Sequence, residues 1–60
     1  MKGVSMYYVM LHPHGLDPVE VASRMYFNDA LDYVYFTRQY LDCDMLIYHR
    51  GSLIASILSS

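Results

Sequence analysis

The 60-residue sequence predicts an α+β fold in which a small, antiparallel-rich sheet carries one helix on one face, with its elements in ββαββ order. Four short runs are rich in β-branched and aromatic residues, which favour strands. One central segment has apolar residues at the three-and-four spacing of a helix. The pair Arg50-Gly51 separates two of the apolar runs, as the turn of a tight hairpin does. A chain of this length predicts a single domain, residues 1–60.

The first predicted strand is the run VSMYYVML, residues 4–11. It is too short for a typical buried helix, and Gly3 and a His-Pro pair bound it. Both of its faces are apolar, with Met6, Tyr8 and Met10 on one and Tyr7, Val9 and Leu11 on the other. We therefore expect this strand in the middle of the sheet, or with both faces covered.

The segment DPVEVASRMYF, residues 17–27, carries conflicting signals. Asp17 and Pro18, followed by Glu20, suit the start of a helix with an N-cap, a first-turn proline and a capping-box acid. A period-two alternation favours a strand instead, with Val19, Val21, Met25 and Phe27 on one face and Glu20 and Arg24 on the other. Because a helix here would have no clear apolar stripe, we favour the strand. The loop HPHGLDP, residues 12–18, then joins the two strands as a hairpin.

From Asn28 onward the pattern is that of a helix. Asn28 suits the N-cap, and Asp29 and Asp32 suit the positive end of the helix dipole. One stripe at helical spacing consists of Ala30, Leu31, Val34, Arg38 and Leu41. A second, aromatic stripe consists of Tyr33, Phe36 and Tyr40, where a helix normally presents polar residues to solvent. We therefore expect one helix with two apolar sides.

The C-terminal part of the chain predicts a second hairpin. The apolar runs MLIYH and SLIASIL, residues 45–49 and 52–58, are separated only by Arg50-Gly51. Gly51 supplies the positive φ that a tight turn requires and that few other residues tolerate.

The composition narrows the classes of partner. Hydrophobic residues form 55% of the chain and charged residues 17%, which is not a disordered composition. The net charge is −2, and Lys2, Arg24, Arg38 and Arg50 are scattered singly, so binding of nucleic acid lacks its electrostatic basis. No apolar stretch is long enough to span a bilayer, and the N-terminus lacks a signal-peptide pattern. Cys43 is the only cysteine, which suits the reducing cytoplasm. Because the chain also begins with Met1, we expect a complete, soluble cytoplasmic protein.

Two histidines, His12 and His14, lie one residue apart in the predicted loop. In an extended segment their side chains project to the same side, which permits a shared metal ion, and His49 could be a third ligand. No known zinc module has this spacing, and Pro13 and Gly15 are typical of an ordinary turn. We favour the turn and keep a metal-stabilised or metal-sensing domain as the alternative function. No nucleophile, base and orienting group can be assembled from the sequence, so we expect neither an enzyme nor a cofactor.

The aromatic residues are the most informative feature for function. A sheet covered by one helix has one inner face, yet the other faces also carry tyrosine, methionine and phenylalanine. Tyrosines can leave their hydroxyl groups in water, but this many rings favour a protein interface. The predicted interface residues are Tyr33, Phe36 and Tyr40 on the helix and Tyr7 and Tyr48 on the sheet.

The resulting expectation is a non-enzymatic protein-binding module that forms a homodimer. We expect an inhibitor or regulator that covers a surface of a larger protein, in the manner of small phage or mobile-element accessory proteins.

Overall fold

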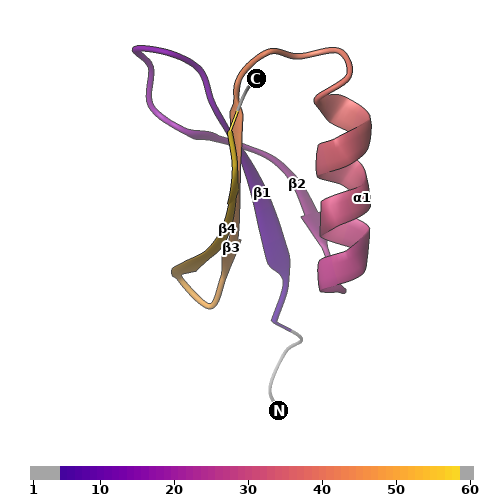
Figure 1. The fold of residues 1–60 in the computed structure, drawn as a ribbon. Coiled ribbons are helices and arrows are strands. Elements are labelled where there is room, and N and C mark those ends of the chain that lie inside the picture. Colours follow the sequence, from indigo (N-terminus) through magenta and orange to yellow (C-terminus); the bar gives the residue numbers. More distant parts are fainter. Residues whose placement is uncertain (1–4, 59–60) are drawn as a thin grey trace.

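The computed structural model describes residues 5–58 and has two layers, an antiparallel sheet and one helix (Figure 1). The elements are β1 (Tyr7–His12), β2 (Val19–Arg24), α1 (Phe27–Thr37), β3 (Asp44–His49) and β4 (Ser52–Ile57). The strand order in the sheet is β2-β1-β3-β4. The predicted α+β class and element order are confirmed. Lys2, Gly3 and Val4, the last at the start of the first predicted strand, lie outside the described residues.

The first hairpin, β1 with β2, is confirmed, and β1 lies in the middle of the sheet as its two apolar faces predict. Within the described residues β1 begins at Tyr7, later than predicted, and it includes His12, which was predicted to lie in the loop. The period-two pattern predicted for the second strand is wrong. Val9 pairs with Ala22 but Met10 pairs with Glu20, so Val21 is an extra residue in a β-bulge. The bulge shifts the alternation by one residue, and Ala22 takes the position beside Val9. The strand ends at Arg24, so Met25 lies in the connection to α1 and Phe27 lies in α1 itself.

The helix begins two residues before the predicted start, because its N-cap is Tyr26 instead of Asn28. Tyr26 is still extended after β2, and the N–H of Ala30 donates to its carbonyl at 3.1 Å. Asn28 is therefore already in the first turn, where its side chain cannot act as the cap.

The helix also ends earlier than the predicted stripe, at Thr37. The carbonyl of Thr37 accepts from the N–H groups of Tyr40 and Leu41, which tighten the chain into a turn toward β3. Arg38 and Leu41 are consequently exposed, and the apolar stripe predicted to include them ends within α1.

The second hairpin, β3 with β4, turns at Arg50-Gly51 as predicted. Both residues have positive φ, 54° at Arg50 and 78° at Gly51, which is the geometry of a type I′ turn. A second bulge places Leu53 opposite Tyr48 and Ala55 opposite Ile47, with Ile54 between them.

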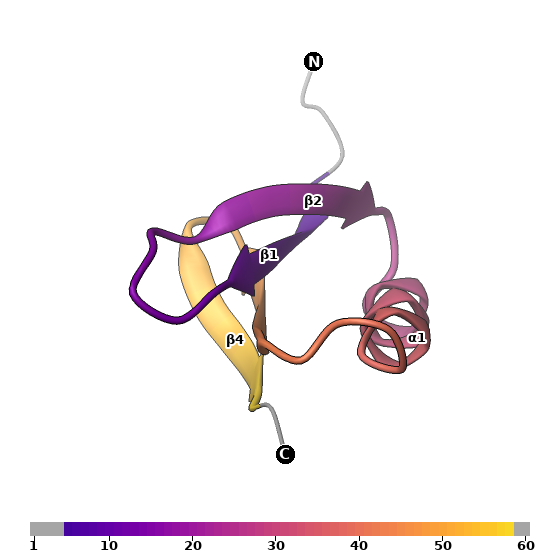
Figure 2. The same ribbon diagram turned by 90° about the horizontal axis from the view of Figure 1, so that it is seen from above.

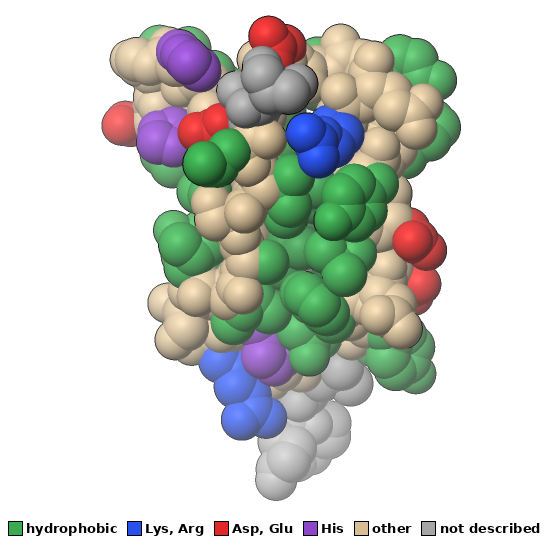
Figure 3. Space-filling model, in the orientation of Figure 1, with side chains coloured by type: hydrophobic (Ala, Val, Ile, Leu, Met, Phe, Trp, Pro, Cys, Tyr) green, Lys and Arg blue, Asp and Glu red, His purple; other side chains and the backbone are tan. Residues whose placement is uncertain are grey.

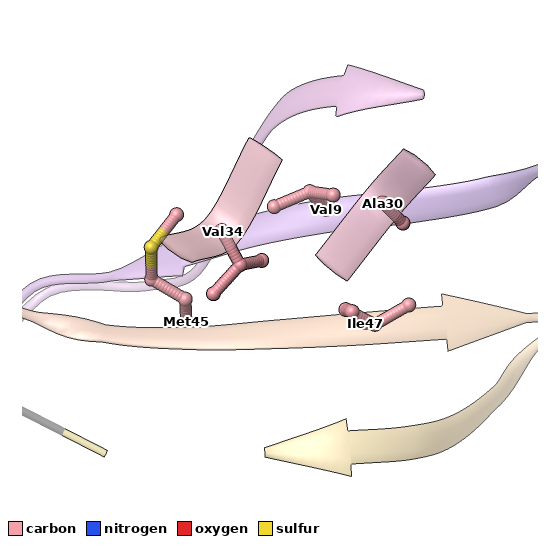
Figure 4. Close-up of a cluster of buried hydrophobic side chains, with 5 residues drawn as sticks. All are labelled: Val9, Ala30, Val34, Met45 and Ile47. Atoms are coloured by element: carbon pink, nitrogen blue, oxygen red, sulfur yellow. The ribbon is translucent and has the colours of Figure 1, made fainter. Parts of the chain in front are cut away.

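The core lies between the sheet and α1 (Figure 4). Among the described residues its fully buried side chains are Val9, Ala30, Val34, Met45 and Ile47. The helix packs mainly against β1 and β2, and in Figure 2 it lies on one side of a twisted sheet. No described element covers the opposite face of the sheet.

Candidate protein-interaction surfaces

Large hydrophobic side chains are more often exposed than buried in residues 5–58. Five hydrophobic side chains are fully buried. Twelve large ones are exposed: Tyr8, Leu16, Val19, Met25, Tyr26, Tyr35, Phe36, Tyr40, Leu41, Leu53, Ile54 and Leu58. Single exposed apolar residues are normal, whereas contiguous ones indicate an interaction site. Whether these twelve side chains form an interaction site therefore depends on which of them are adjacent on the surface.

The first contiguous group is an aromatic pair, Phe36 in the last turn of α1 and Tyr40 in the turn that follows the helix, although Tyr40 was predicted to lie on the helix. Their ring centroids are 5.4 Å apart with planes tilted by 59°, and the residues are 60% and 71% exposed. Asp32, also exposed, lies one helical turn before Phe36 on the same side of α1. The pair thus presents an exposed apolar projection beside a carboxylate.

Tyr33, the remaining residue of the predicted aromatic stripe, is not part of this exposed pair. It is half-buried against β2, where the Arg24 guanidinium lies 5.0 Å from the centroid of its ring. This contact also shows which side of α1 faces β2. Phe36 is two residues from the buried Val34, about 200° around the helix, so its ring points away from the sheet.

Tyr7 lies on the helix-facing side of the sheet. It pairs with His49 across β1 and β3, and the two rings stack at 4.0 Å with planes 9° apart. Its ring also packs at 5.7 Å against Phe27, and the His49 ring nitrogen Nδ1 is 3.2 Å from the Met6 carbonyl oxygen. Tyr7 is half-buried and closes one end of the core.

Tyr48 lies on the opposite side, which we name the helix-free face. This face carries Tyr8, Met10, Leu46, Tyr48, Leu53 and Ser56 from β1, β3 and β4, and Glu20 and Ser23 from β2. Tyr8 pairs with Tyr48, and Tyr48 pairs with Leu53, so an apolar row crosses β1, β3 and β4. Cross-strand neighbours of this kind contact each other directly. The helix-free face therefore presents one continuous apolar row to whatever covers the sheet.

A further apolar surface was not among the predicted sites. We name it the α1–β4 strip; it comprises Phe27, Leu31 and Tyr35 on the helix with Ala55 and Ile57 on β4. The helical residues are spaced by four and lie on the side of α1 away from Arg24. In Figure 3 hydrophobic side chains run along the molecule between the helix and the strands. The sequence contains the spacing, but only the position of α1 over β1 and β2 leaves this side uncovered.

The histidines are not brought together. His12 ends β1, and His14 is exposed in a turn where the N–H of Leu16 donates to the Pro13 carbonyl at 3.2 Å and Gly15 has a φ of 76°. His49 pairs with Tyr7, five residues from His12 along β1, a separation of about 16 Å at the usual rise of a strand. No group of three or more His, Cys, Asp or Glu side chains within residues 5–58 is close enough to share a metal ion. The segment from Pro13 to Leu16 forms the turn that Pro13 and Gly15 predict.

The described part of the chain contains no detected pocket. Within residues 5–58 no helix has the length and apolar character needed to cross a bilayer. No protein-family model, curated protein or solved structure matches the chain.

Proposed function

We propose that this chain is a small, non-enzymatic protein-binding module that inhibits or regulates a larger protein by covering part of its surface, and that it self-associates. The supporting observation is the excess of exposed over buried large hydrophobic side chains in residues 5–58. Several of these exposed side chains form contiguous surfaces, which are typical of protein interfaces.

The aromatic pair is the proposed anchor for the larger protein. Phe36 and Tyr40 are already in contact, so little side-chain freedom remains to be lost on binding. Aromatic side chains that fill a pocket on the partner contribute much of the affinity of such complexes. Asp32 beside Phe36 favours a partner with basic residues around that pocket. Inhibition would then follow from steric occlusion and requires no chemistry by this chain.

Site-specific photo-crosslinking tests this proposal. A photoreactive phenylalanine analogue at position 36 is expected to crosslink one defined protein in the native host. The same analogue at Leu16, an exposed but isolated position, is the control. Tyr40→Asp in the position-36 chain is expected to lower the crosslinking yield by roughly tenfold or more, as loss of an anchor residue does. Equal products from positions 36 and 16 would show that the pair is not a binding site.

A further inference from the structure

The two edge strands of the sheet differ in how they are protected from pairing with another strand. The edge strand β2 contains Glu20 and Arg24 and follows Pro18, features that discourage pairing. The other edge strand, β4, has the sequence SLIASI, with no charged residue and no proline. Both edge strands carry a bulge, so the bulges do not distinguish them. The unpaired backbone groups along β4 are therefore the open edge of the sheet.

The bulge at Ile54 determines which side chains share a face of β4. Leu53 pairs with Tyr48 and Ser56 with Leu46, so both lie on the helix-free face. Ala55 and Ile57 lie on the helix-facing side. By alternation after Ile57, Leu58 returns to the helix-free face.

This arrangement is self-complementary when the strand is reversed. An antiparallel pair related by a two-fold axis keeps each face of the sheet on its own side. Centred on Ser56, such a pair places Ala55 beside Ile57 and, because Ile54 is the extra residue of the bulge, Leu53 beside Leu58 of the second copy. Ser56 meets its own equivalent, so small residues lie at the centre and large ones at both ends.

The charges at the two ends of β4 also suit antiparallel pairing. The turn before β4 carries Arg50. The other end of β4 lies beside Asp44 on β3, with Asp42 two residues earlier, and Arg38 donates to the Leu58 carbonyl at 3.5 Å. Asp42, Asp44 and Arg38 together give that end a formal charge of −1. Arg50 gives the turn a charge of +1. Reversal places the positive turn of each copy at the same end of the joined sheet as the negative end of the other copy, so these charges favour antiparallel over parallel pairing.

We propose that two copies of this protein form a dimer by antiparallel pairing of their β4 strands, which joins the two sheets into one. The proposal builds on the self-association in the proposed function and gives it a location. The open edge, with Leu53 and Leu58 50% and 62% exposed, would bury on the order of 1,000 Å² in total, near the lower limit for specific complexes. We therefore expect a dissociation constant in the micromolar range.

Charge variants at Leu53 and Leu58 test the pairing. Because each Leu53 lies beside Leu58 of the other copy, the double variant Leu53→Lys/Leu58→Lys places like charges together at both ends of the pair. Analytical ultracentrifugation is expected to show a wild-type dimer of twice the 7.0 kDa chain mass. The Lys/Lys variant is expected to raise the dissociation constant by more than about 100-fold.

Two further variants make the result specific. Leu53→Lys/Leu58→Glu places opposite charges together, so its dissociation constant is expected to return to within about tenfold of wild type. Val19→Lys changes a residue that is 55% exposed on the protected edge and is expected to alter the constant by less than about twofold. Circular dichroism of each variant confirms that the fold is retained, and amide exchange of the wild-type β4 is expected to slow with rising concentration.

The proposal is overturned by a wild-type monomer at millimolar concentration, by a Lys/Glu variant that dissociates as fully as Lys/Lys, or by equal dissociation of Val19→Lys. If the Lys/Lys variant fails to fold, β4 amide exchange that is independent of wild-type concentration overturns it equally. The position-36 crosslink does not involve β4, so it distinguishes a failure of the dimer from a failure of partner binding.

Discussion

Val34 is the side chain through which the middle of α1 joins the core. It is fully buried in one cluster with Val9 and Met45 (Figure 4). Val34→Ala removes two methyl groups where the layers cannot close fully, so we expect the free energy of unfolding to fall by about 2 kcal/mol. Domains of this size have only roughly 3–5 kcal/mol of stability from their core. Urea unfolding followed by circular dichroism measures the change.

Leu16→Ala is the matched control, since it removes more apolar volume from a residue that is 65% exposed in the β1–β2 loop. We expect its free energy of unfolding to stay within about 0.5 kcal/mol of wild type. Similar losses in both variants would contradict a core centred on Val34.

Tyr7 and Tyr8 show what a residue pattern leaves open. Both are tyrosines in a strand that is apolar on both faces, so the sequence offers no local reason to prefer Tyr7, the predicted interface residue, over Tyr8. Their roles differ because Tyr7 pairs with His49 on the helix-facing side, whereas Tyr8 pairs with Tyr48 on the helix-free face. The side that a helix covers depends on the whole chain, and no local property of Tyr7 encodes it.

Among the elements, the β3–β4 turn has the strictest backbone requirement. Gly51 has a φ of 78°, and a Cβ at that position would meet no atom within 4 Å. The cost of Gly51→Ala is therefore conformational alone, and we expect a loss of about 1 kcal/mol in the free energy of unfolding. The shift in the urea midpoint at constant slope measures it.

A substitution at Arg50, in the same turn, is expected to raise the free energy of unfolding instead of lowering it. Its φ of 54° is unfavourable for arginine but suits asparagine, which is common at the first central position of a type I′ turn. We expect Arg50→Asn to raise the free energy of unfolding by about 0.5 kcal/mol, even though the 3.2 Å bond from Arg50 Nε to Ser5 Oγ is lost. A loss of stability in Arg50→Asn, or none in Gly51→Ala, would contradict this turn geometry.

The elements that the sequence predicts correctly are those with strong local signals. The Arg50-Gly51 turn and the spacing of Ala30 and Val34 belong to this class. The bulges at Val21 and Ile54 have no local signature, because an extra residue in a strand becomes visible only against its partner strand. The helix start is misplaced for a related reason. Asn28 is a good capping residue, but the extended path out of β2 already makes Tyr26 the cap.

At the scale of the whole molecule, the position of α1 determines which surfaces are left apolar. The helix packs mainly on β1 and β2, so no described element covers the helix-free face, and the α1–β4 strip is half-buried except at the exposed Tyr35. The candidate surfaces on the sheet therefore arise from the arrangement of the layers, whereas the aromatic pair arises locally, from the end of α1 and the turn that follows it. This is why the sequence predicts Phe36 and Tyr40 together but gives no indication of the strip beside β4.

A fold with so small a core is expected to gain stability from assembly, and this makes its melting temperature depend on concentration. For a dimer that unfolds to two chains, a 100-fold rise in concentration adds about 1.4 kcal/mol per chain. With the unfolding entropy of a 60-residue domain, this corresponds to a rise of roughly 5–10 °C in Tm. Leu53→Lys/Leu58→Lys, which blocks β4 pairing but leaves the core of Val9 and Val34 intact, is expected to melt at a temperature independent of concentration. Calorimetry of both proteins over that range decides the point, since a constant wild-type Tm would mean that the core alone supports the fold and that the open edge contributes nothing to its stability.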